Sequence, residues 1–196
     1  MNDNVIKKFY SKKNQVELVE RGGTFCIRKI FTDNISCAKE KAELEALRDQ
    51  NVPKIIETGD NYIYMTYLEG ELFLDRFLTA DNAELERLAL MLAAFIKSYC
   101  AIRHGRCVSD LNFRNFILCK QTLFGVDFED TEEGGEITAV SKAVAFALLY
   151  DIEENNKKSF CEKLISEFSF DKKEIDKAVN KELSCLALRR GITLKS

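Results

Sequence analysis

The sequence predicts an α+β protein with a β-rich N-terminal lobe and a mainly helical C-terminal lobe. Short β-prone runs separated by turn residues fill most of the chain up to Gly70. Beyond Gly70, long segments carry apolar residues at helical spacing. We therefore expect an N-terminal lobe over residues 1–69, built from a five-stranded antiparallel sheet and one helix. A reduced, mainly helical C-terminal lobe should follow over residues 70–196.

The chain should begin with an antiparallel meander of three strands. Residues 5–10 and 16–19 are β-prone runs, and the polar stretch 11–15 between them has turn chemistry. Gly22 and Gly23 then supply a tight turn into a third strand over residues 24–31.

An amphipathic helix is expected over residues 36–48. Leu44 and Leu47 mark its apolar stripe, and Glu40 and Glu43 lie on the same face. Acidic side chains on an inward face are costly unless they are paired. These two residues therefore either have buried partners or lie at the rim of the stripe and stay solvated.

Two more strands should complete the sheet. Pro53, the one proline in the chain, ends the helical segment. Residues 54–57 and 62–67 are β-prone, and residues 68–71 form the connection that leaves the sheet.

The second half of the chain should contain at least three helices. Residues 83–102 carry leucine and aromatic side chains at helical spacing, so we expect one long amphipathic helix with its apolar face in the core. Residues 162–168 and 173–188 have similar but shorter patterns.

Composition excludes several classes of protein. A net charge of −3 and a pI near 5.5 argue against a protein that coats nucleic acid. The N-terminal residues do not resemble a signal peptide, and no apolar run reaches the roughly 20 residues of a membrane span. We expect a soluble, cytoplasmic protein without a membrane span. The sequence leaves open whether it binds a protein partner.

Seven cysteines without regular spacing fit reduced core thiols better than a disulfide scaffold. Cys100, His104, Cys107 and Cys119 could in principle bind zinc. However, the set has no Cys-x-x-Cys pair, and Cys100 falls on an apolar helical face. We therefore expect core thiols rather than a zinc site.

The chemically informative segment runs from residue 108 to residue 130. It contains Asp110, then Asn115 five residues later, then a short apolar hairpin that ends at Asp127-Phe128. Phosphoryl transfer requires a carboxylate near the attacking hydroxyl and oxygen ligands for magnesium on the phosphates. Asp110 suits the first role, and Asn115 and Asp127 suit the second.

These residues resemble a known family. Asp110-Leu-Asn-Phe-Arg-Asn115 resembles the catalytic loop of protein kinases, and Asp127-Phe128-Glu129 resembles their metal-binding Asp-Phe-Gly. The pattern is closest to the aminoglycoside phosphotransferase and lipopolysaccharide-kinase branch. The resemblance covers roughly residues 1–130 and implies a two-lobed protein-kinase-like fold that uses ATP and Mg²⁺.

The resemblance also implies roles in the N-terminal half. Lys29, near the end of the third expected strand, would bind the ATP phosphates, and Glu40 would hold that lysine. Glu40 precedes Leu44 and Leu47 with the spacing found in the family. Arg28 is an alternative to Lys29, because residues 25–28 can also be aligned with the lysine-bearing strand.

The segment that would join the two lobes is implied to bind adenine. Backbone groups of Thr66, Tyr67 and Leu68 would contact the base, and Met65 would lie behind it.

Three departures from the family pattern stand out. The loop 11–15 has no glycine, so it differs from the phosphate-covering loop of protein kinases. Lys12 or Lys13 could contact phosphate there, but we expect a solvated loop. Val108 replaces a structural histidine. Only a short segment follows Asp130, without a recognisable activation segment.

The sequence therefore predicts a phosphotransferase that moves the γ-phosphate of ATP to a hydroxyl group of a small molecule, a glycan or a protein. The alternative is a pseudokinase or a nucleotide-binding regulatory module without transfer activity. A third interpretation treats Asp110, Asn115 and Asp127 as turn residues around a hairpin. The acidic stretch 129–133 is expected to be a solvated loop.

Overall fold

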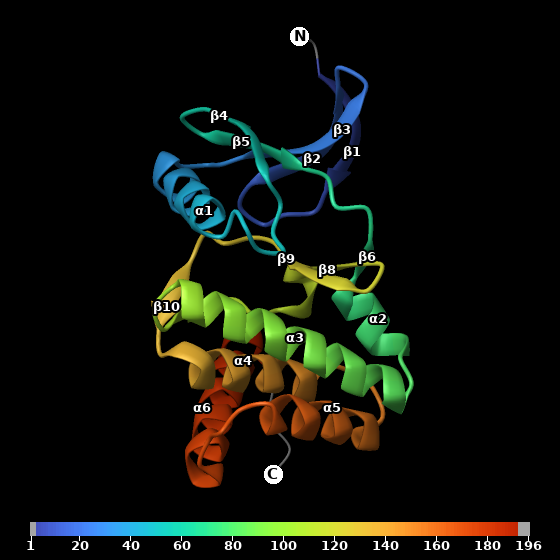
Figure 1. The fold of residues 1–196 in the computed structure, drawn as a ribbon, viewed down its shortest axis with the longest axis vertical. Coiled ribbons are helices and arrows are strands. Elements are labelled where there is room, and N and C mark those ends of the chain that lie inside the picture. The colour runs from blue at the N-terminus through green and yellow to red at the C-terminus, as the bar shows by residue number, and fades with distance from the viewer. Residues whose placement is uncertain (1–2, 192–196) are drawn as a thin grey trace.

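The computed structural model describes residues 3–191. Within this range the chain is α+β, with a five-stranded antiparallel sheet and six α-helices. Figure 1 shows the sheet and helix α1 at one end of the molecule and the other helices stacked at the opposite end. The predicted fold class and the predicted sheet are confirmed at this level.

The large sheet has the strand order β1-β2-β3-β5-β4, and each neighbouring pair is antiparallel. The strands are β1 (Asn4–Phe9), β2 (Gln15–Arg21), β3 (Thr24–Ile30), β4 (Ile55–Thr58) and β5 (Tyr62–Thr66). Gly22 and Gly23 both have positive φ angles, which is the conformation that a two-residue hairpin turn between β2 and β3 requires.

Helix α1 (Asn34–Ala46) begins two residues before the predicted start, because Asp33 caps it. The Asp33 carboxylate accepts a hydrogen bond from the Ser36 backbone N–H at 2.7 Å. Leu44 and Leu47 are buried, as their spacing predicts.

The C-terminal part contains five of these helices: α2 (Phe73–Thr79), α3 (Asn82–Ile102), α4 (Gly135–Leu149), α5 (Glu154–Ser166) and α6 (Lys172–Arg190). Helices α3 and α6 match two of the predicted helices, and the predicted segment 162–168 overlaps the end of the longer α5, which stops at Ser166. The sequence patterns did not reveal α4, because residues 139–147 are buried on every face and show no amphipathic period.

Two small sheets accompany these helices, and the one formed by β6, β8 and β9 lies between the large sheet and α3 (Figure 1). One has the order β6-β8-β9 and the other pairs β7 with β10. Their strands are β6 (Glu71–Leu72), β7 (Arg106–Val108), β8 (Phe116–Cys119), β9 (Thr122–Gly125) and β10 (Thr131–Glu133), with a short 3₁₀ turn η1 (Phe113–Asn115) before β8. The motif segment 108–130 therefore runs through short strands and the loops between them.

Apolar side chains from α1, both small sheets and all the C-terminal helices form one large core cluster. Phe73, Phe77, Phe113 and Phe160 meet within it in four edge-to-face pairs and one tilted pair, with ring centroids 5.0–6.5 Å apart. Aromatic pairs in this arrangement stabilise a core beyond the area that they bury. Among residues 3–191 no helix has both the length and the apolar character that crossing a membrane requires.

Candidate functional site

Lys29 lies at the centre of the candidate site. It is on β3, only 5% exposed, and its ammonium group contacts carboxylates from separate parts of the chain. Lys29 Nζ is 2.5 Å from Glu40 Oε2, 2.6 Å from Asp127 Oδ1 and 2.9 Å from Glu129 Oε1. The predicted pairing of Lys29 with Glu40 is present, and Asp127 joins the same cluster.

Arg28 points away from this cluster, because consecutive side chains of a strand face opposite sides of the sheet. Its guanidinium group lies 2.5 Å from Glu17 and 2.8 Å from Asp3. The sequence left two candidates for the phosphate-binding residue, Lys29 and Arg28. Of the two, Lys29 is the one that faces Glu40 and Asp127.

Burial and charge determine the ionisation of this cluster. Burial raises the pKa of Glu40 to about 7, although the nearby Lys29 ammonium opposes the rise. Burial also acts to lower the pKa of Lys29, but the carboxylates of Glu40 and Asp127 outweigh it and hold this pKa above its usual value. Lys29 therefore stays a cation at neutral pH, as a residue that binds an anion must.

Glu43 is the second acid on the inward face of α1, and it too is buried and paired. The Tyr99 hydroxyl donates a hydrogen bond to Glu43 Oε2 at 2.9 Å, and Arg103 donates to Oε1 at 2.8 Å. Both partners belong to the α3 region, so Glu43 joins α1 to the C-terminal part. The interpretation that Glu40 and Glu43 stay solvated at the rim is wrong.

Asp127 follows β9 and is held between two anchored neighbours. The Val126 backbone N–H donates to the Asn115 carbonyl at 2.9 Å, and the buried ring of Phe128 stacks on Tyr99 with centroids 6.1 Å apart. Asp127 itself has a φ of 67°. This left-handed conformation is uncommon outside glycine and is found often at functional sites. It places the Asp127 carboxylate against Lys29.

The loop that carries Asp110 is fixed by its own hydrogen bonds. Asp110 Oδ1 accepts from the Asn112 backbone N–H at 3.1 Å, and Asn115 Nδ2 donates to the Asp110 carbonyl at 3.2 Å. An amide that donates through Nδ2 keeps Oδ1 as an acceptor. Asp110 is exposed, so its carboxylate can be reached by another molecule.

The β8–β9 hairpin joins these two loops. Phe116 pairs with Gly125 in its ladder, and the bond from Val126 to Asn115 extends the pairing by one step. Asn115 and Asp127 therefore lie at the same open end of the hairpin, and this brings the two predicted metal ligands to one place.

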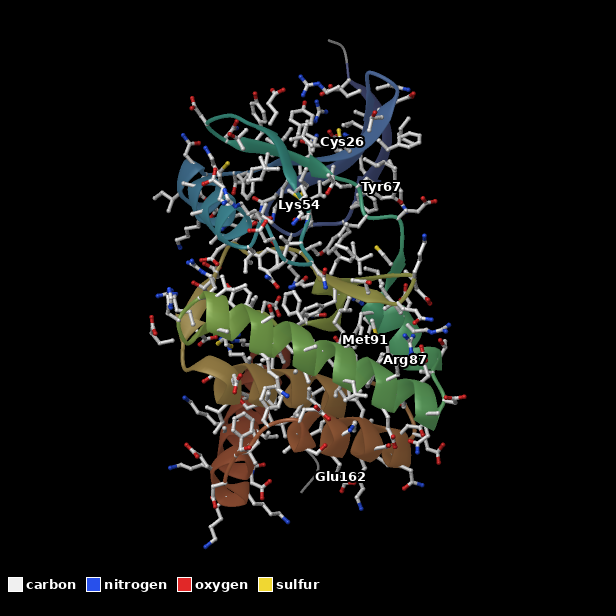
Figure 2. The ribbon with its side chains drawn as sticks, viewed as in Figure 1. Cys26, Lys54, Tyr67, Arg87, Met91 and Glu162 are labelled. Carbon is white, nitrogen blue, oxygen red and sulfur yellow. The ribbon has the colours of Figure 1, made fainter. Side chains whose placement is uncertain are left out.

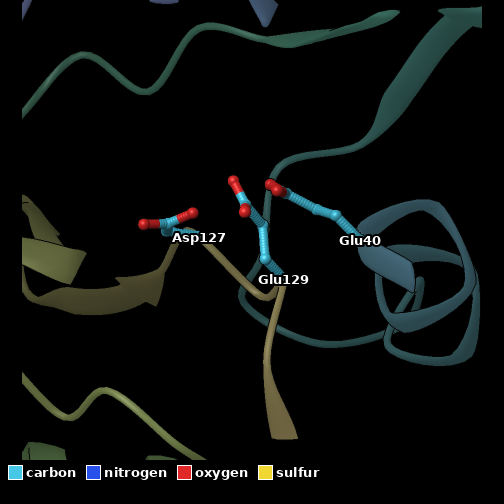
Figure 3. Close-up of side chains that lie close together, drawn as sticks. All are labelled: Glu40, Asp127 and Glu129. Atoms are coloured by element: carbon cyan, nitrogen blue, oxygen red, sulfur yellow. The ribbon is translucent and has the colours of Figure 1, made fainter. Parts of the chain in front are cut away.

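Figure 3 shows three carboxylates that gather at this place, those of Glu40, Asp127 and Glu129. Their oxygen atoms lie within 4.8 Å of one another, and in the described part of the chain this is the one group of three or more such ligands. Oxygen donors of this kind suit Mg²⁺. The partly exposed carboxylate of Asp127 and the free acceptor of Asn115 fit a magnesium ion better than Glu40, which is buried against Lys29.

Glu129 was not predicted as a site residue, and the expectation that the acidic stretch is a solvated loop is wrong for it. Its side chain is only 11% exposed. Besides Lys29, it contacts the amide of Asn14, a buried residue between β1 and β2. The two residues are 115 positions apart, so no local pattern in the sequence could indicate this contact.

The glycine-free loop between β1 and β2 lies over the cluster. Lys13 Nζ is 2.9 Å from Ser36 Oγ, 3.4 Å from Glu129 Oε2 and 3.7 Å from Asp33 Oδ2. Lys13 therefore has acidic partners although half of its side chain is exposed, whereas Lys12 is exposed as predicted.

The four residues predicted at the adenine site are divided between the sheet and the connection that follows it. Met65 is buried on β5 in the core, and the Thr66 N–H donates to the Lys54 carbonyl at 2.9 Å. Tyr67 and Leu68 lie beyond β5, outside the ladder, where the chain runs toward β6 (Figure 2). Their backbone groups, rather than the N–H of Thr66, can bind a ligand.

The Cys and His residues considered for zinc are not gathered into a metal-binding group in residues 3–191. Cys100 and Cys107 are buried thiols, and burial raises their pKa values to about 11 and about 12. His104 is exposed on the turn after α3.

A cavity of about 390 Å³ lies on another side of α1, between the end of that helix, α3 and β9. Leu47, Val52, Phe95 and Tyr99 are among the residues that line it, and none of Lys29, Asp110 and Asp127 does. The cavity is therefore separate from the candidate site.

No protein-family model matches this chain, and no curated protein matches it either.

Proposed function

We propose that this chain is an ATP- and Mg²⁺-dependent phosphotransferase with the two-lobed architecture of the protein-kinase fold. One observation carries the proposal: Lys29 on β3 contacts both Glu40 on α1 and Asp127 after β9. Asp127 is 98 positions from Lys29. Separate motifs in the sequence assigned these residues to one site. If Asp127 were only a turn residue of a hairpin, nothing would require it to contact Lys29 beside Glu40.

Lys29 is the phosphate-binding residue of this proposal. Its ammonium carries a positive charge at neutral pH and is held by Glu40, which fixes its direction. Binding of ATP would exchange the contact with Asp127 for contacts with the phosphates.

Asn115 and Asp127 are the residues that would hold Mg²⁺, which neutralises the phosphates when it is bound. Carboxylates outnumber the ammonium group around Lys29, so a triphosphate alone meets a net negative site. The proposal therefore requires that ATP binds well only together with a divalent cation.

Asp110 is the residue proposed to orient the acceptor hydroxyl and accept its proton. It is exposed, and the Asn112 N–H fixes one of its carboxylate oxygens. The other oxygen remains for the acceptor.

Adenine would bind along the connection after β5. In this proposal the backbone groups of Tyr67 and Leu68, which lie outside the β5 ladder, would form hydrogen bonds with it, and the buried Met65 would contribute an apolar surface.

The second candidate is a pseudokinase or nucleotide-binding regulatory module without transfer. The loop between β1 and β2 favours it, because Lys13 and Asn14 already engage Glu129 beside Lys29. A loop held in this way restricts the space in which phosphates must move.

Transfer of the γ-phosphate from ATP by the purified chain separates the two candidates. The assay uses water and a panel of hydroxyl acceptors, with and without Mg²⁺, and compares the wild type with Asp110→Ala. We expect the variant to lose about a hundredfold or more in rate, since general-base catalysis contributes that much, while it still binds ATP.

Asp75→Ala, which removes an exposed carboxylate on α2, is the matched control and should retain the wild-type rate. Equal rates for Asp110→Ala and the wild type would contradict the assignment of Asp110. Binding of ATP without transfer to any acceptor would favour the regulatory module.

A further inference from the structure

Lys142 is a buried lysine outside the site described above. It lies in the middle of α4, among the residues of that helix that face the core, and is only 8% exposed. A buried ammonium group is costly unless carboxylates or carbonyls satisfy it. The partners of Lys142 therefore indicate what it does.

Those partners lie on three different segments. Lys142 Nζ donates to the Ser109 carbonyl at 3.0 Å, and it lies 2.6 Å from Glu132 on β10 and 3.8 Å from Glu182 on α6. One side chain thus joins the core helix α4 to the C-terminal helix α6, to strand β10 and to the loop that carries Asp110.

The Ser109 contact is the informative one, because Ser109 directly precedes Asp110. The Ser109 N–H donates to the Asp130 carbonyl at 3.0 Å, while its C=O accepts from Lys142. Both backbone groups of this residue are therefore fixed. Asp110 also has local hydrogen bonds to Asn112 and Asn115. The Ser109 contacts add an anchor from other elements directly before it.

The apolar residue at position 108 increases the need for such an anchor. Val108 is buried in the pairing of β7 with β10 and has no side-chain group that could hydrogen-bond to the loop that follows. Lys142 on α4 supplies a hydrogen bond to this loop at the Ser109 carbonyl.

We propose that Lys142 is a positioning residue, which fixes the Asp110 loop through the Ser109 carbonyl without touching the substrate. Its importance for catalysis rests on the proposed phosphotransferase function, whereas its effect on the loop does not. The two can therefore be measured separately.

The test combines amide hydrogen exchange of residues 109–115 with transfer kinetics in the full chain. Lys142→Met keeps the length of the side chain and removes its donors. We expect exchange in this segment to rise about tenfold. The value of kcat should fall about tenfold or more, as expected for a misplaced catalytic group, while KM for ATP changes little. Lys142→Arg should restore part of both properties.

Two control variants separate positioning from charge compensation. Glu182→Gln removes a carboxylate near Lys142 but leaves the Ser109 contact, and Lys177→Met removes an exposed lysine on α6. Neither should change exchange in residues 109–115. If Lys142→Met fails to fold, Lys142→Met combined with Glu132→Gln takes its place, because it does not leave the partly buried Glu132 carboxylate without its cation.

Unchanged exchange of residues 109–115 in the folded Lys142 variant would overturn the inference, whatever its activity. An equal increase in Glu182→Gln would do the same. Faster exchange only in the Lys142 variant, in a chain that transfers no phosphate, would uphold the positioning of the loop and reject the proposed function.

Discussion

Lys29 is the residue that connects the parts of the candidate site. Its ammonium group is shared by carboxylates from α1 and from the segment after β9, and it is almost completely buried. Such a group is stable only because its partners compensate its charge. In the proposed function, binding of a phosphate would have to compete with these carboxylates, so the strength of the present contacts of Lys29 would limit the affinity for the nucleotide.

Substitution of Lys29 should therefore affect binding and stability together. We expect Lys29→Met to weaken Mg-ATP binding about tenfold or more, since charge-assisted hydrogen bonds are lost. It should also lower the free energy of unfolding by about 3 kcal/mol, because Glu40 is left buried without its partner. Titration calorimetry and urea denaturation measure the two effects.

Arg28→Met is the matched control, since Arg28 neighbours Lys29 but faces Glu17 and Asp3. It should leave Mg-ATP affinity nearly unchanged. Loss of binding in Arg28→Met, with binding retained in Lys29→Met, would reverse the assignment of the two residues.

Residue type, spacing and the resemblance to a kinase family indicated Lys29, Glu40, Asp110, Asn115 and Asp127. The fold brings Lys29 on β3, Glu40 on α1 and Asp127 after β9 into contact, and it puts Asn115 at the same end of the β8–β9 hairpin as Asp127. Glu129 and Asn14 could not be foreseen in the same way. Their contact depends on how the first loop folds over a segment 115 positions away, and a single sequence does not encode that distance in any local pattern.

At the scale of elements, the junction of α2 and α3 depends on a small group of charges. Glu84 in the first turn of α3 lies 2.6 Å from Arg87 and 3.1 Å from Arg76 on α2. Hydrogen bonds from Arg87, with a smaller contribution from Arg76, lower the pKa of Glu84 to about 2. This carboxylate therefore stabilises the folded state when it is ionised.

The sign of the pH dependence follows from that lowered pKa. The pKa of Glu84 is about 2 in the folded state and about 4.3 in the unfolded chain, so its contribution is complete above pH 4.3 and is lost as the pH falls toward 2. We expect Glu84→Gln to lower the free energy of unfolding by about 1 kcal/mol at pH 7. This difference should shrink below pH 4.3.

Urea denaturation at several pH values measures this difference. Glu162→Gln on α5, an exposed acid 3.8 Å from Lys158, should show only a small effect at pH 7. A difference between wild type and Glu84→Gln that grows as the pH falls would contradict the account of this junction.

Elements with an amphipathic or alternating pattern, or with a run of β-prone residues between turns, could be predicted, and elements with none of these could not. The strands of the large sheet and helix α3 carry such patterns. Helix α4 does not, because the core surrounds it, and the two-residue strand β6 is too short to show a period. Lys142 was overlooked for the same reason, since it lies in α4.

At the scale of the whole molecule, the candidate site lies where the large sheet, α1 and the small sheets meet (Figure 1). Glu43 on α1 is bonded to Tyr99 and Arg103, so the element that carries Glu40 is tied to the helical part. A ligand bound between Lys29 and Asp127 would hold the same parts together. Binding should therefore stabilise the entire fold.

The most direct test of the central claim is the melting temperature of the full chain with ATP, with Mg²⁺ and with both. A ligand at about a hundred times its dissociation constant stabilises the folded state by about 2.7 kcal/mol. For a chain of this size, that corresponds to a rise of about 5–10 °C. We predict this rise with Mg-ATP, a much smaller one with ATP or Mg²⁺ alone, and its loss in Asp127→Asn. No rise with any nucleotide, or an equal rise in Asp127→Asn, would contradict the claim that this site binds ATP through magnesium.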